Sequence, residues 1–119
     1  FQNEPYSQSK LIRVSKGCIL DVIVDIRPNS QTFGRHLKIE LSKENNNLLF
    51  IPKGFAHGFL SLSDSVIVNY KVDNYYHKNS DNGINPFDPD LNIDWKIKKS
   101  DLLISKKDIK LKYLKNISL

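Results

Sequence analysis

At 119 residues the chain is long enough to bury one core and too short for two domains, so we expect a single domain over residues 1–119. Hydrophobic residues make up 39% and charged residues 26%, which excludes a disordered or fibrous chain. The formal charge is +5, and the whole excess lies in residues 91–119. A basic tail of this kind either binds nucleic acid or forms a solvated lysine-rich surface. The tail has no arginine and no recognisable nucleic-acid module, which favours the solvated surface.

The counts of cysteine and methionine indicate the cellular location of the protein and whether the sequence is complete. A single cysteine, Cys18, cannot form an internal disulfide, and this favours a reducing, cytoplasmic location. No apolar run approaches the roughly 20 residues of a membrane-spanning helix, so we expect no membrane partner. The chain holds no methionine, not even at position 1. We therefore expect it to be part of a longer product.

Short β-rich runs separated by turn residues fill residues 10–72, a rhythm typical of a sandwich or barrel. Lys10–Lys16 and Cys18–Arg27 flank Gly17, which predicts a hairpin. The further strands are predicted over Phe33–Leu41, Leu48–Ile51, Phe55–Ser61 and Ser65–Val72.

The run Cys18–Arg27 alternates between two faces. One face is uniformly apolar and is predicted to be core: Cys18, Leu20, Val22, Val24 and Ile26. The other mixes two aliphatic residues with two carboxylates: Ile19, Asp21, Ile23 and Asp25. This second face lines a polar cavity or is an ordinary solvated strand face, and the alternation alone favours neither.

Residues 73–95 have a loop composition with aromatic anchors such as Tyr75, Tyr76 and Trp95. Long loops in a compact domain are often functional. Residues 100–114 are predicted to form short helical turns, and Ser105 with Asp108 has the form of a capping box.

Few side chains stand out as chemical candidates. The histidines His36, His57 and His77 lie in separate segments with no close pair, so a metal site is not expected. His57 follows a Pro/Gly turn and is either structural or part of a site. Tyr70 can donate a proton to a carbanion or simply pack in its strand, and Lys10 can hold an anion.

Taken together, these segments closely resemble the dTDP-4-dehydrorhamnose 3,5-epimerase family over almost the whole chain. The resemblance rests on blocks in the family's order: Gln8–Val14, Asp21–Arg27, Ser30–Gly34, Ile51–Phe59, Tyr70–Lys71, Asn74–Tyr76 and Ser105–Asp108. It implies an all-β, cupin-like jelly-roll sandwich with a loop-rich, partly helical C-terminal segment. It also implies a homodimer that uses no metal and no organic cofactor.

The implied activity is epimerisation of dTDP-4-dehydro-6-deoxy-D-glucose at C3 and C5, giving dTDP-4-dehydro-L-rhamnose for dTDP-rhamnose biosynthesis. Both carbons lie beside the C4 ketone, so loss of either proton gives an enolate. Inversion then needs a base on one face, an acid on the other, and a positive group at the oxyanion.

The resemblance assigns a role to each matching position. Tyr70 corresponds to the proton donor, and Lys10 to the lysine that neutralises the enolate and fixes the substrate. Asp108 corresponds to the carboxylate paired with the catalytic histidine, a role compatible with the capping box. The expected substrate contacts are His57, Asp81, Lys107 and Tyr76, the last stacking on thymine.

One expected group is missing from the sequence. The family's general base is a histidine of an Arg-Gly-Leu-His motif placed immediately before the residues that match Phe1 and Gln2. The chain begins one residue after that histidine, so we expect it to be the C-terminal two-thirds of the epimerase domain, without the N-terminal strands and the catalytic-histidine motif. We expect this segment alone to be inactive, and none of its three histidines takes the base's position. A related 3- or 5-epimerase, a ketoisomerase, and a non-catalytic sugar-nucleotide-binding module are the alternatives.

Overall fold

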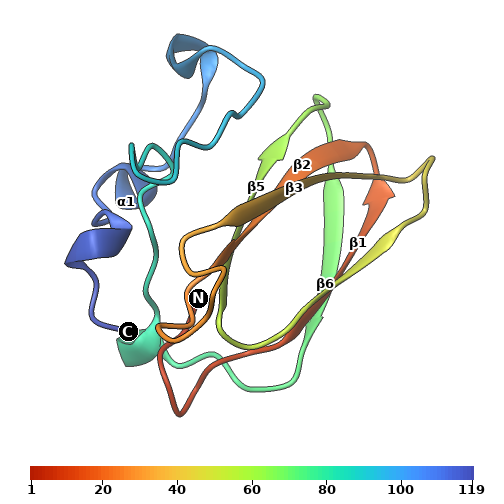
Figure 1. Ribbon diagram of the computed structural model, residues 1–119. Helices are drawn as coiled ribbons and strands as arrows, with labels where there is room; N and C mark the ends of the chain where they lie inside the picture. Colours follow the sequence, from red (N-terminus) through yellow and green to blue (C-terminus); the bar gives the residue numbers. More distant parts are fainter.

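Six strands form two antiparallel sheets in the computed structural model, which describes residues 1–119 (Figure 1). One sheet has the order β4-β1-β6 and the other β3-β2-β5. The bounds are β1 Lys10–Lys16, β2 Cys18–Asp25, β3 His36–Ser42, β4 Leu48–Ile51, β5 Phe55–Ser61 and β6 Ile67–Val72. The predicted all-β sandwich is confirmed, and the bounds of β4 and β5 are those predicted.

The rest of the chain is loop-rich and partly helical, as predicted. Its helical turns are η1 (Lys78–Ser80), η2 (Lys99–Asp101), α1 (Lys106–Ile109) and η3 (Leu114–Asn116). Figure 1 shows this C-terminal segment, in cyan to blue, beside the strands, with the two chain ends close together. No helix has the length and apolar character needed to span a membrane.

The predicted hairpin between the first two strands is wrong. β1 and β2 belong to different sheets, and the chain passes from one sheet to the other at Gly17. This glycine has φ +74°, and a Cβ at its position would lie 2.4 Å from the Ser65 carbonyl oxygen. One glycine in the left-handed region turns the chain out of its first sheet, whereas a tight hairpin needs two central residues.

Both faces of β2 are buried, which settles the alternative that the sequence left open. Ile19 packs between the sheets with Ile12 and Val14 of β1, Leu41 of β3 and Ile51 of β4. The carboxylates Asp21 and Asp25 share that interior face and are themselves buried. The face is therefore not a solvated one, and it places two acids between the sheets.

The opposite face of this sheet is covered by the C-terminal segment. Val24 and Ile26 pack with Ala56 of β5 and with Leu91 and Leu114. This second cluster is the reason that a segment with so little regular structure has a defined position.

The third strand starts later than the sequence predicts, at His36 rather than Phe33. The Asp25 carboxylate holds the preceding loop in a turn. It accepts hydrogen bonds from the Arg27 backbone and guanidinium and from the Ser30 and Thr32 hydroxyls, at 2.6–3.0 Å. The Arg27 guanidinium also holds the pKa of Asp25 far below its usual range, and the hydroxyls add to this.

Candidate active site

Sheet register puts four of the chemical groups on the facing sides of the two sheets. Lys10 and Ile12 share a face of β1, Tyr70 pairs with Ile12, and Ile12 is in the inter-sheet core. On the opposite sheet His57 pairs with Ile23, on the face that carries Asp21. Lys10 and Tyr70 therefore face the sheet that carries His57 and Asp21.

His57 and Asp21 form a close pair. The imidazole Nε2 lies 2.9 Å from Asp21 Oδ2, and the side chains are 10% and 0% exposed. In the neutral imidazole this contact makes Nε2 the donor and leaves Nδ1 as an acceptor. The sequence did not predict this pair, because it depends on the β2–β5 register.

The second oxygen of that carboxylate, Asp21 Oδ1, is buried without a hydrogen-bond partner. Asp21 also interacts electrostatically with the Lys10 ammonium. Burial lowers the pKa of the Lys10 ammonium, while Asp81 and Asp21 act in the opposite direction and only partly offset it. No protein group forms a hydrogen bond or ion pair with this ammonium, so its charge is available to an anionic or oxyanionic ligand.

Tyr70 lies at the open side of the sandwich. Its side chain is 67% exposed although it is on the interior face of β6, and no protein group hydrogen-bonds its hydroxyl. The sandwich is therefore accessible at this edge, where the hydroxyl can meet a ligand.

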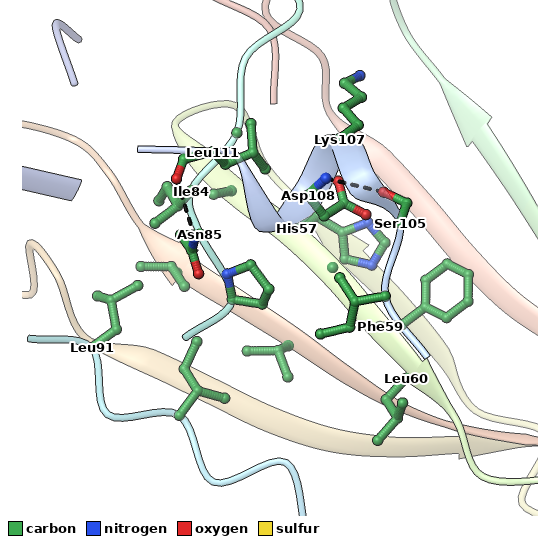
Figure 2. Close-up of a pocket in the computed structure, with 18 of the residues that line it drawn as sticks. His57, Phe59, Leu60, Ile84, Asn85, Leu91, Ser105, Lys107, Asp108 and Leu111 are labelled. Carbon is green, nitrogen blue, oxygen red and sulfur yellow. Dashed lines mark hydrogen bonds between the residues drawn. The ribbon is translucent and has the colours of Figure 1, made fainter. Parts of the chain in front are cut away.

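A pocket of about 480 Å³ extends from His57 to the C-terminal segment (Figure 2). The polar residues of its lining include His57, Asp81, Ser105, Lys107 and Asp108, together with Asn82 and Asn85. Its apolar residues include Val22, Val24, Ala56, Leu91 and Trp95. Such a pocket, with apolar walls and several polar side chains, suits a ligand with an aromatic or sugar part and an anionic part.

Asp81 is hydrogen-bonded to two of the other predicted substrate contacts. It accepts a hydrogen bond of 2.6 Å from Lys107 Nζ and one of 3.2 Å from the Tyr76 hydroxyl. Burial raises the pKa of Asp81, but the Lys107 ion pair and the Tyr76 hydroxyl outweigh burial and the net shift is downward. In turn, Asp81 raises the pKa of Lys107. The loop that carries Tyr76 is thus connected to α1.

Asp108 stands beside this cluster on α1. Its backbone N–H donates to the Ser105 hydroxyl at 3.0 Å, so the predicted N-cap is confirmed. Its carboxylate lines the pocket, as Figure 2 shows. No histidine of residues 1–119 pairs with it: His57 is bonded to Asp21, and His77 to Ser80.

The predicted site residues therefore form two groups. Lys10, Tyr70 and His57 come from strands, whereas Tyr76, Asp81, Lys107 and Asp108 come from the loop and α1. One pocket is lined by His57 from the first group and by Asp81, Lys107 and Asp108 from the second. Asp21 is the member that sequence reasoning missed, although its place on the mixed face of β2 was a signal.

Comparison with known proteins gives a consistent result. The sequence profile of the dTDP-4-dehydrorhamnose 3,5-epimerase family matches residues 1–116. The dTDP-4-dehydrorhamnose 3,5-epimerase of Methanothermobacter thermautotrophicus is 53% identical over 109 residues, which are 91% of this chain and 58% of that protein.

Solved structures agree with the sequence matches. The dTDP-4-dehydrorhamnose 3,5-epimerase of Elizabethkingia anophelis superposes with a TM-score of 0.94 at 43% identity, covering 97% of this chain and 63% of that one. The epimerase of Legionella pneumophila, solved with dTDP-4-keto-L-rhamnose, gives 0.93 at 42% identity, covering 98% and 62%.

The chain thus spans less than two thirds of the length of each of these relatives. The similarity to these structures confirms the cupin-like sandwich. The chain belongs to the dTDP-4-dehydrorhamnose 3,5-epimerase family.

Proposed function

We propose that the protein to which these residues belong epimerises dTDP-4-dehydro-6-deoxy-D-glucose at C3 and C5. The observation that carries this proposal is the inter-sheet placement of Lys10 and Tyr70 opposite the His57–Asp21 pair, in a chain of this family. A cation, a proton donor and a fixed imidazole are groups that an enolate mechanism needs.

The reaction begins when a base removes the proton at C3 or C5, and the electron pair moves through the new C=C bond to the C4 oxygen. The Lys10 ammonium, with no protein partner, stabilises the resulting enolate oxygen. The Tyr70 hydroxyl then gives its proton to the opposite face of the carbon, and the tyrosinate recovers a proton from solvent. The protonated base releases its proton to solvent, so the centre is inverted with no net change in atoms or electrons.

His57 has a binding role in this scheme. Asp21 accepts from Nε2, so the neutral ring presents Nδ1 to a substrate hydroxyl as an acceptor. The removal of the proton is not assigned to it. We assign that step to the family's motif histidine, and the role of Asp108 as its partner remains part of the proposal.

In the proposed complex the nucleotide lies against the polar residues of the loop and α1 at the pocket. Lys107 supplies positive charge for the diphosphate, Asp81 contacts the substrate, and Tyr76 is an exposed aromatic surface for thymine. A homodimer in the cytoplasm, acting without a metal or an organic cofactor, is part of the same proposal.

Solvent exchange tests this function. The protein as its gene encodes it is incubated with dTDP-4-dehydro-6-deoxy-D-glucose in D₂O, and deuterium at C3 and C5 is followed by NMR. We expect incorporation at both carbons and a product of L configuration. Incorporation at one carbon would replace the proposal with a mono-epimerase, and incorporation at neither carbon would overturn it.

A further inference from the structure

Gln2 is a buried side chain to which neither the fold nor the proposed chemistry gives a role. It is 7% exposed and lies in the segment that precedes β1. Its amide Nε2 donates to the carbonyl oxygens of Tyr6 at 2.6 Å and Tyr75 at 3.2 Å, and its Oε1 accepts from the His77 N–H at 2.7 Å. All three bonds are to backbone groups, so Gln2 holds the main chain in place.

Two of these bonds bracket one residue. Tyr75 C=O and His77 N–H are the backbone groups on either side of Tyr76, so the Gln2 amide fixes the backbone that carries the Tyr76 ring. The ring of His77 is also held, because it stacks on Tyr6 with centroids 3.8 Å apart and planes at 5°.

The backbone of the same segment holds the other end of the loop. Gln2 forms an antiparallel bridge with Asp81, the Asn3 N–H donates to Ser80 C=O at 2.9 Å, and the Asn82 N–H donates to Phe1 C=O at 3.0 Å. Asp81 is the acceptor of the Tyr76 hydroxyl. Gln2 therefore fixes Tyr76 at its backbone and, through Asp81, at its hydroxyl.

The Tyr76 side chain is 67% exposed in spite of these constraints. An exposed aromatic ring held at both ends beside the Lys107 ammonium is arranged to receive a planar base that carries a phosphate. Ordering such a ring before binding removes an entropic cost that the ligand would otherwise meet.

We infer that Gln2 is a positioning residue for nucleotide binding: its amide orders Tyr76 before the nucleotide arrives. The inference rests on the proposed function, because it deepens the base-binding part of that site. It predicts that the Gln2 amide affects thymidine nucleotide affinity through Tyr76 and not through general stability.

The test uses dTDP as the probe and calorimetry on the protein as its gene encodes it. Gln2→Ala should weaken dTDP binding about tenfold, because without these hydrogen bonds the Tyr76 ring is less ordered before the nucleotide binds. The matched control is Gln8→Ala. It removes another hydrogen bond from a glutamine to the same loop, Nε2 to Asn74 C=O at 2.7 Å, which does not involve the peptide groups on either side of Tyr76. We expect the control to change the dissociation constant by less than twofold.

A double-mutant cycle separates positioning from stability. In a Tyr76→Ala background, Gln2→Ala should have almost no further effect on dTDP affinity, because the ring it orders is gone. If Gln2→Ala does not fold, Gln2→Met replaces it, since this variant keeps the length of the side chain and loses the amide bonds.

Three results would overturn the inference: wild-type affinity in the Gln2 variant, an equal loss in the Gln8 control, or a full loss that persists without the Tyr76 ring. Failure of the wild-type protein to bind dTDP would instead overturn the proposed function, so the two failures are distinguishable.

Discussion

The strand interior and the loop rim position their side chains by different physical means. Sheet register and the buried apolar core around Ile12 and Ile19 set the positions of Lys10, Tyr70, His57 and Asp21. Tyr76, Asp81 and Lys107 are set by hydrogen bonds between surface segments. The interior suits chemistry that tolerates little movement, and the rim suits a ligand that must enter and leave. Substitutions of these four interior groups should therefore lower kcat, and substitutions of the three rim groups should weaken substrate binding.

Lys10→Ala should have the largest effect. Without the ammonium the enolate oxygen loses its cationic partner, and kcat should fall about 10²- to 10³-fold with a smaller change in KM. Steady-state kinetics on the full-length protein measure this effect. Near-normal kcat in a folded Lys10→Ala variant would contradict the assignment.

The same lysine predicts a pH dependence. Burial lowers the pKa of Lys10 below its ordinary 10.5, so the charge, and with it kcat, should disappear at a lower pH than for an exposed lysine. Lys10→Arg should move this alkaline limb to higher pH, because guanidinium stays charged. An alkaline limb that is identical in the two proteins would assign the titration to another group.

Asp21→Asn should have the next largest effect. The amide can no longer accept a charge-assisted bond from His57 Nε2, and losing such a bond costs about 1.5–3 kcal/mol, or about 10- to 100-fold in kcat/KM. Asp64→Asn, a change at an exposed aspartate, is the matched control. Equal kinetics in the two variants would mean that the pair is structural only.

Asp25→Asn tests the interior for stability and not for catalysis. The carboxylate is buried and its main partner Arg27 is half exposed, so we expect a loss of about 2 kcal/mol in the free energy of unfolding. The pKa of Asp25 is lowered in the folded state, so its stabilisation is present above pH 4 and is lost as the pH falls below the unfolded-state value of about 3.9. Denaturant titrations at pH 7 and pH 3 should therefore show a smaller difference between variant and wild type at pH 3.

Lys107→Ala should have the smallest effect on the fold. Its ion pair with Asp81 is largely exposed and contributes little to stability, so Tm should barely change. The affinity for dTDP should fall a few-fold and should depend less on salt. A fall in kcat with unchanged affinity would contradict its place in the rim.

Features that depend on neighbouring residues could be predicted from the sequence, and features that depend on strand pairing could not. The strands β4 and β5 and the Ser105 cap were predicted within their bounds because each depends on neighbouring residues. The Gly17 crossing and the His57–Asp21 pair depend on which strands become neighbours, and alternation within one strand does not contain that information. The late start of β3 was missed because a side chain from β2, Asp25, holds the preceding loop.

The candidate residues came from the family resemblance and not from local pattern alone. Lys10 and Tyr70 lie sixty residues apart, and only the β1–β6 pairing joins them. The family match at Phe1 and Gln2 gave Gln2 no role, because an amide that bonds three backbone groups has no characteristic spacing.

In the proposed mechanism the Tyr70 hydroxyl is the acid on the face opposite the base, and Tyr70→Phe removes that acid alone. The variant is incubated with substrate in D₂O, and NMR follows both deuterium incorporation and configuration at C3 and C5. Without the hydroxyl, proton removal should continue and the recovered substrate should gain deuterium with its configuration retained, while inverted product nearly disappears. Inversion at the wild-type rate by a folded Tyr70→Phe variant would contradict the account.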